Sequence, residues 1–168
     1  MRLSIILLAL AFGVAACGSD DDSGASAGGA STGVVSVATV DGADVLADPA
    51  GKTLYTAAVE KGGKILCVDA CTSFWAPLLA SAAEADEAAG TLDAELGVVK
   101  RPDGEQQLTF DGLPLYTFAE EGAGKLEGDG FADDFQGTHF EWEAARTSGG
   151  GGPQPSDDQP GGGYDYGY

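Results

Sequence analysis

Histidine and basic residues are scarce in this sequence, and each shortage excludes a class of function. His139 is the single histidine, and it lies in a predicted strand, where a nucleophilic triad would have no second candidate base. Eight basic residues against 27 acidic ones give a formal net charge of −19. A surface of that sign repels the phosphate backbone of nucleic acids. We therefore expect no enzymatic activity and no nucleic-acid partner.

Cysteine is rare too, and the first of the three stands at a processing signal. Arg2 precedes an apolar run at 3–14, which has the length of a secretory signal peptide and is too short for a permanent membrane helix. The small residues before Cys17 resemble the lipobox of bacterial lipoproteins. That resemblance implies removal of residues 1–16 and a lipid anchor, with fatty acyl chains such as palmitate, on Cys17. The alternative is an ordinary signal peptide that leaves Cys17 as a free thiol.

The other two cysteines, Cys67 and Cys71, form the one internal pair that remains. Outside the cytoplasm we expect them to form a disulfide. Side chains four apart on a regular helix stand too far apart for that bond, so the segment should be a tight turn. The alternative is a reduced pair that binds Cu(I) or cycles as a redox switch. Two oxidised cysteines and one distant histidine suit zinc poorly, so we expect no cofactor.

Large apolar side chains are missing from both flanks of the expected domain. Residues 17–33 are rich in glycine, serine and aspartate, and residues 147–168 in glycine, proline and tyrosine. Such segments bury too little apolar surface to offset the entropy of ordering. We predict a flexible lipid-anchored linker at 17–33, one folded domain at 34–146 and a disordered tail at 147–168.

The folded part contains one stretch twice. Residues 51–64, GKTLYTAAVEKGGK, return at 112–125 as GLPLYTFAEEGAGK, with eight of fourteen positions identical. Asp111-Gly112 before the second copy is a strong signal for a two-residue hairpin turn. Residues 48–51, DPAG, suit a type I turn before the first copy. Each copy is therefore predicted to be the return strand of a β-hairpin.

Alternating patterns predict further strands at 34–40 and 138–145. Residues 97–110 are predicted to form a strand, a turn at RPDG and a second strand that leads to Asp111. Ser81 with Glu84 resembles a capping box, and Gly90 is expected to end that short helix. We predict a small, mainly β single domain of two related hairpin units, at about 34–80 and 95–146. It should have about seven or eight short strands, a helix between the units and disordered termini.

Several motifs together resemble one known family. Gly-x-x-Leu-Tyr, the Cys67/Cys71 pair, Trp75-x-Pro-Leu-Leu, RPDG and QLTFDGLPLYTF are similar to predicted bacterial lipoproteins of the secreted-repeat family, over residues 45 to 143. The Tyr-x-(Phe/Trp/Tyr)-x-x-Asp motif of that family corresponds to Tyr116, Phe118 and Glu121, with glutamate in place of aspartate. The first copy departs further, because Ala57 stands where the aromatic residue is expected. The family has no established activity, so the resemblance implies architecture and anchoring only.

Two groups of residues are candidates for binding. Tyr116, Phe118 and Trp75 with Glu121 would bind a ligand if they formed an exposed patch; the alternative is burial in the core, with Glu121 accepting hydrogen bonds from loop amides. The acidic segment at 126–135 offers weak candidates for calcium ligands. These are Glu127, Asp129, Asp133 and Asp134. Their spacing does not match an EF-hand, which favours a solvated acidic loop.

Taken together, the sequence predicts a lipid-anchored lipoprotein on the extracytoplasmic face of a bacterial cell envelope. We expect a non-enzymatic binding or envelope-interaction module, with the membrane as partner through the anchor and an envelope protein or small molecule as ligand. The alternative is an extracellular redox or metal-handling protein that uses Cys67 and Cys71.

Overall fold

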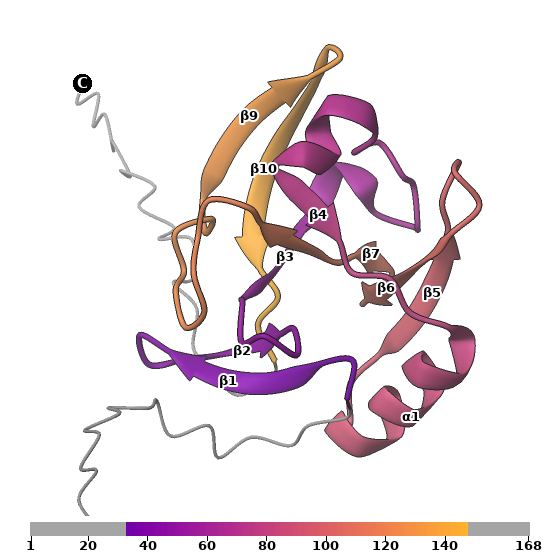
Figure 1. The fold of residues 1–168 in the computed structure, drawn as a ribbon, viewed down its shortest axis with the longest axis vertical. Coiled ribbons are helices and arrows are strands. Elements are labelled where there is room, and N and C mark those ends of the chain that lie inside the picture. Colours follow the sequence, from indigo (N-terminus) through magenta and orange to yellow (C-terminus); the bar gives the residue numbers. More distant parts are fainter. Residues whose placement is uncertain (1–32, 148–168) are drawn as a thin grey trace, which may run out of the picture.

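The computed structural model describes residues 33–147 (Figure 1). The predicted signal peptide, Cys17, nearly all of the predicted linker and nearly all of the predicted tail lie outside the described residues. No helix within 33–147 is both long and apolar enough to cross a membrane.

The described chain is mainly β, as predicted, and its ten strands form three antiparallel sheets. The two-stranded sheet consists of β1 (Ser36–Val40) and β2 (Ala43–Ala47). The five-stranded sheet has the order β4 (Trp75–Pro77), β8 (Tyr116–Phe118), β3 (Leu54–Ala57), β10 (Thr138–Ala144) and β9 (Phe131–Phe135). The three-stranded sheet consists of β5 (Leu96–Lys100), β6 (Gln106–Phe110) and β7 (Leu113–Pro114).

The turn predictions are confirmed. Asp111 and Gly112 both have positive φ, of 50° and 74°, and connect β6 to β7. In the other unit, the amide of Gly51 donates to the carbonyl of Asp48 at 2.9 Å, which closes the four-residue turn. Local turn chemistry thus sets the start of both repeated strands.

The two repeated strands pair with each other at the centre of the five-stranded sheet. Tyr55 of β3 lies opposite Tyr116 of β8, which are equivalent positions of the two copies. Outside β8 lies β4 of the first unit, and outside β3 lies β10 of the second unit. The units are therefore intertwined, because each adds its tryptophan strand next to the repeated strand of the other (Figure 1).

The helix α1 (Ala82–Leu92) connects β4 to β5 along the chain and packs on β5 (Figure 1). Its predicted capping box is present, with Ser81 and Glu84 each accepting a hydrogen bond from a backbone amide of the other. The prediction that Gly90 ends the helix is wrong. The helix continues past Gly90 because the amide of Asp93 still donates to the carbonyl of Ala89. Asp93 caps the helix in the left-handed conformation, at φ 51°.

The core has two parts, separated by the alternation of side chains along the strands. Tyr116 and Phe118 point into an aromatic cluster with Trp75 and Trp142, whereas Leu115 points into an aliphatic cluster beneath α1. Successive side chains of a strand point to opposite faces, so Leu115 points away from Tyr116 and Phe118.

The strand count and the loop at 126–135 need correction. Strands β4 and β9 were not predicted, and the return strand predicted in the second copy is divided into β7 and β8 at Leu115. Residues 131–135 are not a solvated loop but the edge strand β9, because their backbone pairs with β10 in register from Phe131 to Phe135.

Candidate functional site

The tyrosine and glutamate of each copy bond to the other copy. The hydroxyl of Tyr55 donates to Oε2 of Glu121 at 2.6 Å, and the hydroxyl of Tyr116 donates to Oε1 of Glu60 at 3.1 Å. All four residues are buried. Since Glu60 and Glu121 are equivalent in the repeat, the two bonds are related by the same approximate two-fold symmetry as the strands.

Each glutamate also accepts two backbone hydrogen bonds from the loop that follows it. Glu60 Oε1 accepts from the amides of Leu66 and Cys67, at 2.6 and 2.8 Å. Glu121 Oε2 accepts from the amides of Glu127 and Gly128, at 3.0 and 3.3 Å. These donors stand at equivalent places in the two copies. The expected role of Glu121, to accept hydrogen bonds from loop amides, is therefore present twice.

Burial raises the pKa of both glutamates above the ordinary value. It also raises the pKa of Tyr55 and Tyr116, and the neighbouring glutamates add to that rise. The second carboxyl oxygen of each glutamate is buried and accepts no hydrogen bond from the described part of the chain. The two tyrosine–glutamate hydrogen bonds between the copies are called the internal lock. The motif residues Tyr116 and Glu121 are two of its four buried residues.

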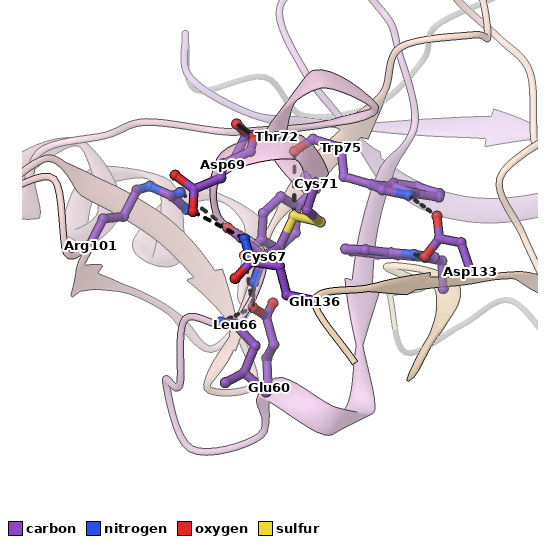
Figure 2. The surroundings of a disulfide bond; sticks show 12 residues. Glu60, Leu66, Cys67, Asp69, Cys71, Thr72, Trp75, Arg101, Asp133 and Gln136 are labelled. Carbon is purple, nitrogen blue, oxygen red and sulfur yellow. Dashed lines mark hydrogen bonds between the residues drawn. A yellow bond between two sulfur atoms is a disulfide. The ribbon is translucent and has the colours of Figure 1, made fainter. Parts of the chain in front are cut away.

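The two tryptophans share one carboxylate. Trp75 of β4 and Trp142 of β10 are stacked, with ring centroids 4.0 Å apart. Their indole Nε1 atoms donate to the two oxygens of Asp133, at 2.8 and 3.0 Å. Figure 2 shows Asp133 facing the indole nitrogen of Trp75. Asp133, a weak calcium candidate in the sequence, therefore has both oxygens engaged by the core.

The stack extends beyond the tryptophans on both sides. Phe118 stacks on Trp75 at 4.5 Å, and Phe140 stacks on Trp142 at 5.3 Å. Each aromatic ring excludes water from the next, so the stack is a continuous apolar element in the centre of the domain.

The disulfide between Cys67 and Cys71 is present, with the two Cα atoms 5.2 Å apart. The segment is the 3₁₀ helix η2 (Asp69–Ser73), which agrees with the predicted tight turn. Both cysteines are fully buried beside Trp75 (Figure 2). A second 3₁₀ helix, η1 (Ala58–Glu60), carries Glu60 to its place under the loop.

The other acidic candidates are dispersed. Asp129 pairs with Arg146 at 2.6 Å, and, although burial opposes it, this guanidinium lowers the pKa of Asp129. Asp134 lies 3.2 Å from the exposed ring of His139, and Glu127 is exposed. Among residues 33–147, no three histidine, cysteine or acidic side chains gather as a metal site would require. The calcium candidates are therefore not brought together.

A cleft opens at the outer end of the aromatic stack. It encloses about 340 Å³ and lies beside β9 and the loop after β8. Its lining consists of Phe74, Phe118, Glu120, Phe131, Asp133, Asp134 and Phe135. Phe74 and Phe131 are 44% and 40% exposed. Of the predicted binding residues, Phe118 reaches this cleft, whereas Tyr116, Trp75 and Glu121 are buried in the core.

Sequence reasoning missed most of this cleft. Phe131, Asp133 and Phe135 lie on the same side of β9 because side chains alternate along a strand. The pattern FADDF could therefore have revealed an edge strand with two aromatic residues on one face. The acidic residues clustered in the same segment favoured the prediction of a loop instead. A larger hollow of about 510 Å³ near Ser81 and Gly104 has no aromatic residue in its lining.

Comparison with known proteins places part of this architecture in a family. Residues 97–139 match the family described as a secreted repeat of unknown function. The match confirms the resemblance inferred from the motifs for the second copy of the repeat, from β5 to the start of β10, and does not extend to the first copy. No curated protein and no solved structure matches the chain.

Proposed function

We propose that this protein is a non-enzymatic binding module, anchored by lipid at Cys17 to the extracytoplasmic face of a bacterial cell envelope. The match to a secreted repeat supports the location, and the lipobox-like residues before Cys17 support the anchor. The ligand is an envelope protein or a small molecule that occupies the aromatic cleft.

The observation that carries this proposal is the exposure of Phe74 and Phe131 beside a buried aromatic stack. Exposure of an apolar side chain to water is unfavourable, and burial of that surface against a ligand would be favourable. Neither ring takes part in the lock between the copies. A cavity of about 340 Å³ is also within the range of small-molecule sites, which is roughly 300–1,000 Å³.

The absence of catalysis in this proposal is supported by the placement of the titratable groups. Glu60 and Glu121, whose pKa values are raised, are buried, bond to the tyrosines and do not line the cleft. His139 is exposed on β10 beside Asp134 and does not itself line the cleft. A general base needs both a suitable pKa and access to a substrate.

The alternative, redox or copper chemistry at Cys67 and Cys71, has weaker support. Both sulfur atoms are buried against Trp75, within a disulfide. Exchange reactions require access of a thiolate to a sulfur atom, so this function would need the segment at 67–71 to open.

The experiment is site-specific photo-crosslinking in cells that express the full chain. A benzophenone amino acid replaces Phe131 in the cleft or, as a control, the exposed Leu79. We expect a discrete adduct from position 131, absent from position 79 and retained when Cys67 and Cys71 are replaced. Equal labelling at the two positions would contradict the cleft as the binding site, and loss of the adduct in a folded cysteine variant would favour the alternative.

The anchor is tested separately by growth with labelled palmitate. We expect label on the full chain and none on the Cys17→Ser variant. Label that survives in Cys17→Ser would contradict the anchor without affecting the cleft.

A further inference from the structure

We propose that the aromatic cleft binds a small organic cation, with a quaternary ammonium group as its best-fitting head. This inference rests on the proposed function and names the ligand class of the same cleft.

The first argument is the arrangement of the rings. Phe118 is almost fully buried beneath the cleft, and Phe131 lies 5.3 Å from it, centroid to centroid, tilted by 42°. A second pair is formed by Phe74 and Phe135, whose centroids lie 5.9 Å apart. Four phenylalanine rings thus line one cleft. The negative faces of aromatic rings attract a cation held within about 6 Å of their centres.

The second argument is the charge of the lining. The residues other than phenylalanine are Glu120, Asp133 and Asp134, and no lysine or arginine of the described chain lines the cleft. The whole chain carries a formal net charge of −19. The field at the cleft therefore favours cations and disfavours fatty acids or other anionic apolar ligands.

The third argument distinguishes a quaternary ammonium from a metal ion or a primary amine. Both oxygens of Asp133 already accept indole hydrogen bonds, at 2.8 and 3.0 Å. One oxygen of Asp134 lies 3.2 Å from the ring of His139. Asp133 therefore contributes charge while each of its oxygens is already engaged, and a primary amine would find acceptors only on Glu120 and Asp134. A quaternary ammonium has no N–H donors to satisfy and presents methyl groups to the rings.

The size of the cleft favours a small molecule. A volume of about 340 Å³ accommodates one cationic head and a short chain. A basic polypeptide would need a groove that continues past the cleft to bury a stable interface of at least about 1,000 Å². We therefore commit to a small cation and treat a basic peptide as an outcome of the test.

Asp133 provides a direct spectroscopic reporter of binding. The chain contains two tryptophans, and both indole N–H groups donate to this cleft residue. A ¹H–¹⁵N spectrum therefore has two indole signals that sense the cleft. The protein is the full mature chain in maltoside micelles, which carry no cationic headgroup, at about 0.15 M KCl to screen non-specific attraction.

The probes are choline and its uncharged carbon isostere, 3,3-dimethylbutan-1-ol. We expect choline to shift both indole signals saturably, and the isostere to bind about tenfold more weakly or worse, because only the charged head gains from the rings and carboxylates. Phe131→Ala and Glu120→Gln should each weaken choline binding several-fold, whereas Leu79→Ala, which alters an exposed side chain outside the cleft lining, should not.

Several results would overturn the inference. No shift with up to about 50 mM choline contradicts it, as does equal affinity for the isostere, which would indicate an uncharged apolar ligand. Choline binding that Phe131→Ala leaves unchanged places the cation elsewhere. A basic peptide that shifts both signals at concentrations where choline does not would identify a polypeptide ligand. In each case a specific adduct at position 131 in cells would leave the broader binding function standing.

Discussion

The two copies of the repeat share their internal lock and differ where the molecule meets its surroundings. In both, tyrosine bonds to the glutamate of the other copy, and that glutamate holds two amides of its own loop. At the position of Phe118 in the second copy, the first has Ala57. At the position of Gly128, the first has Cys67. The cleft and the disulfide therefore arise at positions where the copies diverge.

This difference distinguishes the motif residues that stabilise the fold from the motif residue that reaches the cleft. Tyrosine and glutamate recur because they close the central sheet, and they are inaccessible in both copies. Phe118 occurs in one copy and reaches the cleft. A motif residue that is repeated and buried stabilises the fold, whereas the residue found in one copy is the one to test for binding.

The largest expected effect comes from removing either glutamate of the lock. Glu60→Ala leaves two amides and the hydroxyl of Tyr116 without their acceptor, and should lower the free energy of unfolding by about 3–5 kcal/mol. Glu121→Ala should cost nearly as much, and exposed Glu87→Ala should cost little. Urea unfolding measures all three. A cost below about 1 kcal/mol for one glutamate would show that the lock is not symmetric.

The next effect tests the divergence at Gly128. A Cβ atom there would lie 2.9 Å from Cζ of Tyr55 and 3.0 Å from Cη2 of Trp75. Gly128→Ala should therefore cost about 2–3 kcal/mol and alter the near-ultraviolet circular dichroism of the aromatic cluster. Gly122→Ala is the control, because its Cβ would meet no atom within 4 Å. Equal stability of the two variants would contradict the packing described.

Removing the disulfide, which the second copy lacks, should have a similar or smaller effect. The bridge closes a short loop between Cys67 and Cys71, and its loss should cost about 2 kcal/mol by the chain-entropy model. The double variant Cys67→Ala/Cys71→Ala avoids burying a hydroxyl, and thermal unfolding without reductant measures the change. The fold and choline binding should survive. A folded variant that has lost binding would link the disulfide to function.

A double-mutant cycle tests whether the tyrosine of one copy bonds to the glutamate of the other copy. Tyr55→Phe with Glu121→Ala should show a coupling of about 1 kcal/mol, because each change removes the hydrogen bond that the two side chains share. Tyr55→Phe with Glu60→Ala should be close to additive, since these residues of one copy share no hydrogen bond. The reverse pattern would mean that each copy is closed on itself.

The smallest expected effect is a change with pH. Burial raises the pKa of Glu60 and Glu121 in the folded state above the ordinary 4.5, so folding binds protons. Their contribution to stability is full below pH 4.5 and is lost as the pH rises through the raised values. Stability should thus fall on going from pH 4 towards pH 7, and Glu60→Gln/Glu121→Gln should flatten that slope. An unchanged slope would show that other acidic groups cause it.

The sequence by itself determined the local features of this protein. Positive φ at Asp111 and Gly112, the turn closed by Gly51 and the capping box at Ser81 each depend on neighbours a few residues away. The mainly β composition and the Cys67–Cys71 bridge are similarly local, because alternation and spacing are visible in short windows. The failures were local too, where competing signals overlapped, as at Gly90 and in the segment FADDF.

Only the tertiary structure decided how the two copies combine. The repeat predicts two hairpins equally well side by side or intertwined, since both arrangements satisfy the same turns. Pairing of Tyr55 with Tyr116 brings together strands that are about sixty residues apart, and the choice depends on which arrangement buries both tryptophans and satisfies Asp133. The cleft is a consequence of that choice, because Phe74, Phe118 and Phe131 meet only when strands of both units share one sheet.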